Sequence, residues 1–306
     1  MDAVSHLLRL ARPQARLDKR CLLGGATRMD VAAHAERKAP FHVLLEGACT
    51  LEIGSKLLEV RAGDVVLIPG GAPHRVTTPG CEPLSPTAET AGEAFVTTRS
   101  AQSRAPVIDL FCGHYTFGAG AGALLFRSLP DPLHVSFGSS DEGEEVLRML
   151  SALMRGEARR EGDGTAAILS ALCTVLLAMV LRTSRGVNAN ATLWTAAGDG
   201  RIAGVVERVL ADPGADWSIE RLSRAAAMSR ATFLRHFVRS TGMTAGTFLG
   251  QVRLMTAAEL LATTDATVAS VAGQVGYHSE SAFSRSFRSA VGTTPARFRR
   301  ASVRPA

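Results

Sequence analysis

The alternation of apolar and polar positions changes character along this chain of 306 residues. Residues 40–77 hold short apolar runs such as FHVLLEG and GDVVLIPGG, each closed by Gly or Pro, and VIDLFCGHYTF resumes the pattern at Val107. Such runs predict short β-strands joined by tight turns, at the spacing of an antiparallel barrel or sandwich. Residues 141–160 and 165–182 instead show helical spacing around an EGDG break, and predict a helical hairpin.

Two stretches offer little to bury. Residues 78–106 are rich in Pro, Ser, Thr and Glu and predict a mobile insertion, and residues 185–200 predict a linker. From Arg201 onward the spacing is that of short helices only. We therefore expect an α+β chain of two domains: an antiparallel β-barrel with a helical hairpin over residues 1–184, and an all-α domain over residues 201–306.

One short helix occurs twice in the second domain. SRATFLRHFVRSTG, residues 229–242, returns as SESAFSRSFRSAVG, residues 279–292. In each copy a Ser can cap the helix, and two Phe four residues apart lie on one face, where they pack against a preceding shorter helix. The pattern predicts two helix-turn-helix units, which suit two successive major grooves of DNA about 34 Å apart.

The charge distribution supports a polyanionic partner for this domain. The net charge is +6, but residues 201–306 hold 14 arginines and no lysine against seven acids, which gives +7 and leaves about −1 for the first 200 residues. A plain helical bundle explains the Phe pairs, but it explains neither the paired arginines nor the basic surplus.

The last hundred residues resemble the DNA-binding domain of the AraC/XylS family of bacterial transcription regulators. MSRATFLRHFVRSTG and VGYHSESAFSRSFRSAVGTTPARFR carry the resemblance. It implies that bases or phosphates face the following residues: Arg230, Ala231, Thr232, Leu234 and Arg235 in the first helix, and Glu280, Ser281, Ser284 and Arg285 in the second. Arg239 and Arg288 lie on the same two outer faces. The resemblance further implies promoter DNA as partner, and RNA polymerase if the protein is an activator.

The first domain has a cupin-like motif. Gly63, Pro69, Gly71 and His74 fit G-x5-P-x-G-x2-H, the second cupin motif, whereas the first motif is degraded. His42 could stand in for a lost ligand, so the candidate divalent-metal set is His34, Glu36, His42 and His74. A metal-dependent cupin enzyme needs a complete set, so we expect a binding module that needs no cofactor.

The first residues of the chain indicate which chemical signal the first domain responds to. MDAVSHLLRLARPQARLDKRCLLGG resembles the reactive-chlorine-sensing activators of the same family, which implies oxidant sensing at Cys21 and near Cys112. Hypochlorous acid oxidises thiols readily, and the basic residues before Cys21 and the His after Cys112 suit a reactive pair. A small ligand bound in the barrel is the alternative signal.

The other cysteines have weaker assignments. Cys173 lies in an apolar helix and is expected to be packing, Cys81 to be exposed, and Cys49 has no predicted role. Five cysteines and no export signal predict reduced thiols in the cytoplasm. The longest uncharged stretch, residues 165–181, is slightly short for a membrane span, so we expect no membrane and a dimer interface through the hairpin of residues 141–184.

Overall fold

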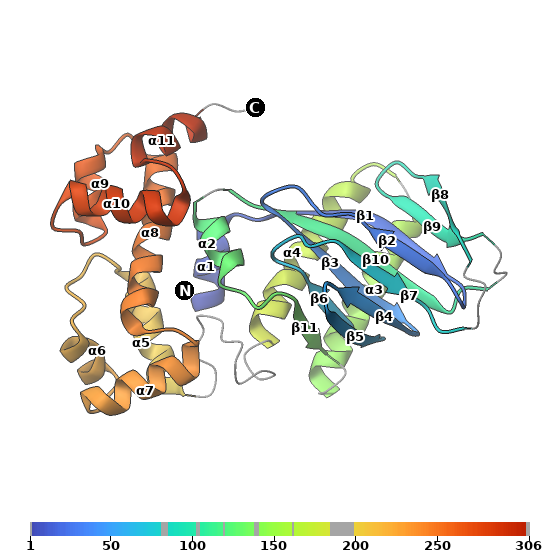
Figure 1. The fold of residues 1–306 in the computed structure, drawn as a ribbon, viewed down its shortest axis with the longest axis horizontal. Helices are drawn as coiled ribbons and strands as arrows, with labels where there is room; N and C mark the ends of the chain where they lie inside the picture. Colours follow the sequence, from blue (N-terminus) through green and yellow to red (C-terminus); the bar gives the residue numbers. More distant parts are fainter. Residues whose placement is uncertain are drawn as a thin grey trace. The chain divides into compact units, whose positions relative to one another are not determined.

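The computed structural model describes residues 2–80, 85–101, 105–118, 120–137, 141–160, 162–183 and 199–303 (Figure 1). The chain divides into two compact units, and neither is continuous in sequence. The barrel unit comprises Pro13–Thr116 and Pro130–Thr183. The helical unit comprises Met1–Arg12, Phe117–Leu129 and Ser184–Ala306. The predicted α+β architecture of a barrel and an all-α domain is confirmed.

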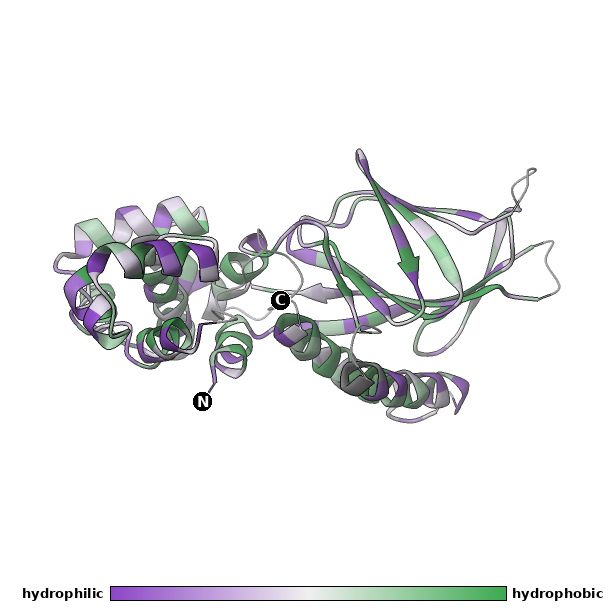
Figure 2. Cartoon of the chain, turned by 90° about the horizontal axis from the view of Figure 1, so that it is seen from below, coloured by the Kyte–Doolittle hydropathy of each residue, from purple (hydrophilic) through white to green (hydrophobic). Residues whose placement is uncertain are grey.

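The barrel unit is built from two sheets. The larger has the strand order β11-β6-β3-β10-β1-β9-β8, and the smaller has the order β2-β7-β4-β5. The strands are β1 Gln14–Leu23, β2 Arg28–Val31, β3 Lys38–Glu46, β4 Ala48–Ile53, β5 Lys56–Arg61, β6 Asp64–Leu67, β7 His74–Thr77, β8 Thr87–Ala91, β9 Val96–Ser100, β10 Ile108–Thr116 and β11 Leu133–Ser136. Neighbouring strands are antiparallel except β1 and β9, which are parallel. Figure 2 shows hydrophobic residues running along many of these strands.

Side chains from both sheets fill the barrel. The larger sheet supplies Cys21, Leu44, Leu110 and Cys112, and the smaller sheet supplies Leu51, among others, to one buried cluster. The apolar runs that predicted strands are buried on both faces in β3, β6 and β10. The expected mobile insertion at residues 78–106 differs from the structure, because its described part holds β8 and β9. These are polar strands, and β8 lies at the sheet edge, so neither carries the apolar signal that predicts a strand.

The helical hairpin forms as expected. Its helices are α3, Asp141–Arg160, and α4, Thr165–Thr183. α4 is long and apolar enough to cross a membrane by length and composition, but it packs on β1 and α3. Its polar contacts fix that position: Ser170 Oγ donates to the carbonyl of Ala15 over 2.7 Å, and Tyr115 Oη donates to the carbonyl of Cys173 over 2.8 Å.

The helical unit contains α1 Ala3–Ala11, α2 Ala121–Arg127, α5 Gly200–Ala211, α6 Ile219–Ala225, α7 Arg230–Thr241, α8 Ala245–Thr263, α9 Val268–Gln274, α10 Glu280–Val291 and α11 Pro295–Val303. The expected linker at 185–200 lies almost wholly outside the described residues. α6–α7 and α9–α10 are the two predicted helix-turn-helix units, and α8 connects them (Figure 1).

Two helices join this unit that we expected in the first domain. α1 and α2 contact each other, and both contact α8. Arg12, just after α1, pairs with Glu259 of α8 at 2.5 Å, and Arg127 Nη1 donates to the carbonyl of Ala290 over 3.1 Å. Gly120 lies so close to α8 that a Cβ there would come within 2.6 Å of Ala258 Cβ. The segments flanking β1 and β10 are therefore part of the helical unit.

Candidate functional site

The two helix-turn-helix units repeat the same local chemistry. Ser229 Oγ accepts from the backbone N–H of Thr232, and Ser279 Oγ accepts from that of Ala282, so each serine caps its recognition helix. Each helix ends at a glycine in the left-handed region, with φ of 69° at Gly242 and 83° at Gly292. The repeat seen in the sequence is thus a repeat of helix start and stop signals.

Aromatic packing fixes the inner face of each recognition helix. Phe237 lies 5.4 Å from Phe233 and 5.6 Å from Phe248 of α8, measured between ring centroids. The second unit repeats this arrangement with Phe283, Phe287 and Phe298 at 5.6 and 5.4 Å. Because these rings are buried, the opposite face of each helix must point to solvent.

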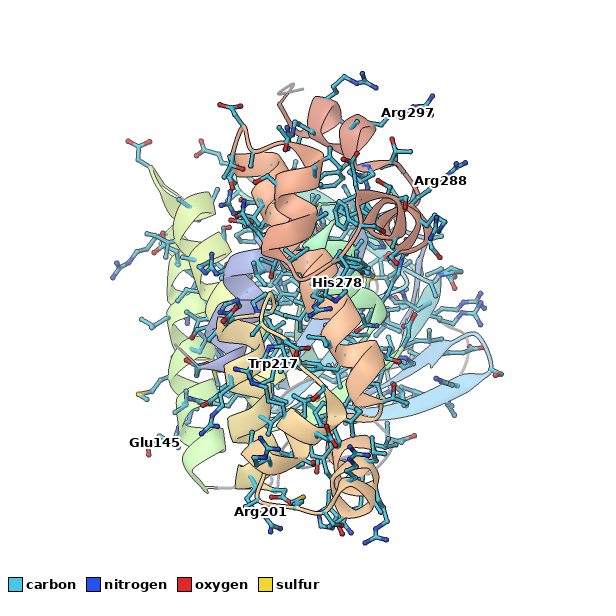
Figure 3. The ribbon with its side chains drawn as sticks, turned by 90° about the vertical axis from the view of Figure 1, so that its left-hand side faces the viewer. Glu145, Arg201, Trp217, His278, Arg288 and Arg297 are labelled. Atoms are coloured by element: carbon cyan, nitrogen blue, oxygen red, sulfur yellow. The ribbon has the colours of Figure 1, made fainter. Side chains whose placement is uncertain are left out.

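The expected DNA-facing residues lie on those outer faces. Thr232 and Ser284 are half-buried; the exposed residues are Arg230, Ala231, Leu234, Arg235, Arg239, Glu280, Ser281, Arg285 and Arg288. Figure 3 shows Arg288 projecting from its helix. Leu234 and Val238 are large apolar side chains left 41% and 44% exposed, as suits contact with thymine methyl groups. α8 has 19 residues, a length of about 28 Å. These contacts with DNA stay a prediction.

A second cluster, the thiol–imidazole chain of Cys21, Cys112, His42 and His74, lies inside the barrel. Cys112 Sγ lies 3.7 Å from Cys21 Sγ and 3.1 Å from His42 Nδ1, and His42 Nε2 lies 2.7 Å from His74 Nε2. All four residues are buried. β10 and β3 align Cys112 with His42, whereas Cys21 is paired with Leu110 and so lies diagonally from Cys112.

Hydrogen-bond donors and acceptors in the thiol–imidazole chain can be assigned by starting from His74. His74 Nδ1 faces the carbonyl of Ala72 at 2.9 Å, and a carbonyl only accepts, so Nδ1 carries the proton. His74 Nε2 is then the acceptor, His42 Nε2 donates to it, and His42 Nδ1 is left to accept from the Cys112 thiol. Burial holds the pKa of His42 well below its usual value and lowers that of His74, which keeps both rings neutral.

The Cys112 thiol is protonated at rest. The hydrogen-bond contact with Cys21, together with burial, raises the pKa of Cys112 well above its usual value. The His that follows Cys112 in sequence, His114, was expected to support a reactive thiol, but His114 Nδ1 instead bonds Asp18 Oδ2 at 2.5 Å, and His42 Nδ1 is the acceptor beside Cys112. Burial raises the pKa of Cys49 and of Cys173 to about 12. Cys81 lies outside the described residues.

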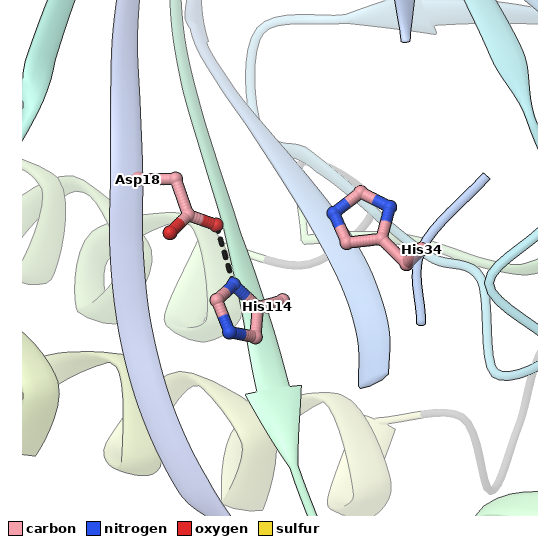
Figure 4. Close-up of side chains that lie close together, drawn as sticks. All are labelled: Asp18, His34 and His114. Atoms are coloured by element: carbon pink, nitrogen blue, oxygen red, sulfur yellow. Dashed lines mark hydrogen bonds and ion pairs between the residues drawn. The ribbon is translucent and has the colours of Figure 1, made fainter. Parts of the chain in front are cut away.

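A cavity of about 610 Å³ opens beside the cluster. Its lining includes Asp18, His34, His42 and Cys112, whereas Cys21 lies behind Cys112 and is fully buried. Small molecules in the cavity therefore meet Cys112 first. Asp18, His34 and His114 form a group whose ligand atoms lie within 4.8 Å of one another (Figure 4).

The four-residue metal set expected from the cupin motif is not assembled among the described residues. Glu36 is exposed in the turn before β3. His42 turns one ring nitrogen to Cys112 and the other to His74, and His34 falls in the group with Asp18 and His114. Sequence spacing missed Asp18 because the strand pairing has a β-bulge between Leu17 and Lys19, which the pattern of apolar residues does not reveal.

Comparison with known proteins agrees with both units. A cupin family model matches residues 2–184, and a helix-turn-helix domain model matches residues 222–301. The chain belongs to the AraC family of transcription regulators, with an N-terminal cupin domain. An uncharacterised HTH-type transcriptional regulator of Haemophilus influenzae is 29% identical over 98% of this chain and 99% of its own. The RCS-specific HTH-type transcriptional activator RclR of Escherichia coli is 28% identical over 98% and 97%.

Solved structures give partial likenesses. The DNA-binding domain of AdpA, determined in complex with a target DNA, is 37% identical over 33% of this AraC-family chain and 91% of its own, with a TM-score of 0.32. ToxT from Vibrio cholerae is 13% identical over 95% and 98%, with a TM-score of 0.38. The protein is thus a DNA-binding transcription regulator, as its domain composition and its regulator relatives agree.

Proposed function

We propose that this regulator is a cytoplasmic activator that binds promoter DNA and recruits RNA polymerase when its barrel unit is oxidised at Cys112 and Cys21. The observation that carries the proposal is the pair of buried sulfurs 3.7 Å apart, one of them lining a cavity. The similarity to a relative named as RCS-specific supports reactive chlorine as the oxidant. The proposal assigns no catalytic role to the thiol–imidazole chain.

The proposed chemistry balances with hypochlorous acid as the oxidant. The Cys112 thiol reacts with HOCl to give a sulfenyl chloride and water. The Cys21 sulfur then attacks the Cys112 sulfur, a disulfide forms, and chloride and one proton leave. The two thiols lose two electrons, which reduce the chlorine of HOCl to chloride. The proton of the Cys112 thiol, which is shared with His42 Nδ1 at 3.1 Å at rest, leaves with the oxygen of HOCl as water.

The bridge would strain the β1–β10 pair, and that strain supplies a signal. Diagonal partners on antiparallel strands have Cα atoms about 7–8 Å apart, beyond the roughly 4.4–6.8 Å of ordinary disulfides. The sulfurs must also close from 3.7 Å to about 2.05 Å. Forming the bond therefore favours a slide of β1 along β10, and the bulge at Asp18 gives β1 a place to adjust.

Covalent connections carry such a slide into the helical unit. α1 ends at Ala11 and β1 begins at Gln14, while β10 ends at Thr116 and α2 begins at Ala121. α1 and α2 contact each other, and both contact α8. A displacement of α1 relative to α2 therefore acts on α8, the helix that separates the two recognition helices. The coupling is limited by how differently the reduced and oxidised states stabilise each arrangement.

A homodimer through α3 and α4 belongs to the same proposal. These helices expose Met149 and Leu153 on α3 and Ile168 and Val175 on α4, at 45–61% of their surface. Their spacings of four and seven residues place each pair on one helix face. An exposed apolar face of this kind is typical of a subunit interface.

The test is mass spectrometry of the reduced full-length chain before and after about one to two equivalents of hypochlorous acid. We expect a Cys21–Cys112 cross-linked peptide. In Cys21→Ser we expect oxygen adducts on Cys112, and in Cys112→Ser an unmodified Cys21, because the cavity reaches Cys112 first. Cys49→Ser is the matched control and should keep the cross-link. If all cysteines react alike, or if none of these products forms, oxidant sensing is wrong.

A small ligand is the second candidate signal. The cavity of about 610 Å³ combines apolar Met29 and Val31 with polar Asp18 and His34, as binding pockets commonly do. The two signals are separated by screening small molecules on the Cys112→Ser variant. The quantity measured is the change in its affinity for promoter DNA. A ligand that acts on this variant would support the pocket, whereas a response that needs the thiol would support oxidation.

A further inference from the structure

A group of two imidazoles and one carboxylate stands at the cavity, separate from the thiol–imidazole chain. Asp18, His34 and His114 each offer a ligand atom, and all of these atoms lie within 4.8 Å of one another. Figure 4 shows Asp18 and His114 joined by a hydrogen bond and His34 across from them. Asp18 and His34 also line the cavity.

Three different elements bring these side chains together. Asp18 is the extra residue of the β1 bulge, since Leu17 pairs with Gly113 and Lys19 pairs with Cys112. A bulge of this kind re-aims a side chain and is over-represented next to functional sites. His114 comes from β10 and bonds the Asp18 carboxylate at 2.5 Å. His34 comes from the loop between β2 and β3.

His34 is the least satisfied member of the group. Its ring atom Nδ1 is buried and makes no hydrogen bond of ordinary geometry among the described residues, since the interaction with the Ala32 backbone is a weak one. Backbone hydrogen bonds hold the loop that carries it: the His34 N–H donates to the carbonyl of Gly71 over 2.9 Å, and the Lys38 N–H donates to that of Ala35 over 3.1 Å. A buried nitrogen with a free lone pair or proton is costly unless something binds it.

We propose that Asp18, His34 and His114 bind one divalent transition-metal ion of the Zn²⁺ class. Two imidazoles and a carboxylate form a ligand set typical of such ions, and three protein ligands leave further coordination positions open toward the cavity. At metal–ligand distances of about 2.0–2.1 Å the ligand atoms must close to roughly 3.4 Å. The exposed residues on either side of His34, in the β2–β3 loop, leave room for that movement.

The interior histidine pair is a poorer site for the same ion. His42 bonds Cys112 through Nδ1 and His74 through Nε2, so its ring stands between those two ligand atoms. One ion cannot lie on both sides of the ring. An ion bound to either ring nitrogen of His42 would also replace one of its hydrogen bonds in the thiol–imidazole chain. The Asp18 group is therefore the better site for the ion, and it ties β1 to β10 beside the cysteines.

The test uses Zn²⁺ titration of the reduced full-length chain, with metal analysis after dialysis and Co²⁺ as a spectroscopic probe. We expect one ion per chain, and binding at least tenfold weaker in His34→Ala and in Asp18→Asn. Asp18→Asn can keep a hydrogen bond to His114, which guards against unfolding. His74→Ala and His278→Ala are controls for the interior pair and for a helical-unit histidine, and should bind normally. The Co²⁺ spectrum should lack a thiolate charge-transfer band.

Three outcomes overturn the proposal. Absence of saturable Zn²⁺ binding shows that there is no site. Loss of binding in His74→Ala with retention in His34→Ala moves the ion to the interior pair. A thiolate band with Co²⁺ moves it to Cys112 or Cys21. Circular dichroism of each variant shows whether lost Zn²⁺ binding is due to unfolding. His34→Ala is the decisive variant, because its backbone lies in a loop and the substitution should leave the fold intact.

Discussion

Gly113 offers the sharpest test of how the two cysteine-bearing strands fit together. It lies on β10 between Cys112 and His114 and pairs with Leu17 on one side and Phe41 on the other. A Cβ at this position would come within 2.3 Å of the Arg16 carbonyl oxygen and 2.5 Å of Phe41 Cζ. The first contact is with backbone, so a change of side-chain rotamer cannot relieve it.

The Gly113→Ala change should therefore force β1 away from β10 beside the bulge. Overpacking of this kind costs about 1–3 kcal/mol, and we expect the upper end because backbone must move. For a unit of this size about 3 kcal/mol lowers the melting temperature by roughly 6–12 °C. Gly156 in α3 is the control, since a Cβ there meets nothing within 4 Å and alanine favours a helix by about 0.5–1 kcal/mol.

The assay is urea and thermal unfolding followed by far-ultraviolet circular dichroism, together with the alkylation rate of Cys112. Gly113→Ala should unfold at lower urea and label faster at Cys112, and Gly156→Ala should do neither. A Gly113→Ala protein within about 0.5 kcal/mol of the original would refute the strand register from which this cost is worked out.

Three further results are expected. Arg235→Ala should weaken binding to the protein's own site by about 1–3 kcal/mol and relax its sequence preference in competition assays; equal weakening on all DNA would make it a phosphate contact. Burial lowers the pKa of His42 and His74, so the unfolded chain takes up more protons than the folded one below about pH 6.5. The free energy of unfolding should then fall between pH 6.5 and 5.5, by up to about 1.4 kcal/mol per pH unit for each histidine, and a flat urea profile in chelator would contradict this. Cys49 and Cys173, with pKa about 12, should resist alkylation at pH 8, where roughly one thiol in ten thousand is ionised; rapid labelling of either would show that its burial is wrong.

The sequence predicts the helix-turn-helix units well because each signal in them is local. The caps at Ser229 and Ser279, the Phe pairs and the terminal glycines all act within one or two helical turns, so a repeat in sequence becomes a repeat in structure. The outer faces follow directly, since burying one face leaves the other in solvent.

The site in the barrel is harder to predict for equally physical reasons. The bulge at Asp18 leaves no mark in the apolar pattern, and it takes the register of β1 and β10 to bring Asp18 to His114 and Cys21 to Cys112. The apolar face of α1 indicates that the helix is buried, but it does not indicate whether it packs in the barrel unit or in the helical unit. Each of these depends on contacts between residues about 90 or more positions apart, which short-range patterns do not encode.

Footprinting of the full-length chain on its own upstream DNA, reduced and after hypochlorous acid, tests the central claim most directly. We predict protection of two stretches about one helical turn apart that weakens steeply with salt, and a footprint that changes on oxidation in the original protein but not in Cys112→Ser. Absence of protection at low salt would contradict the DNA-reading role of the helical unit. An unchanged response to oxidant in Cys112→Ser would contradict the thiol switch.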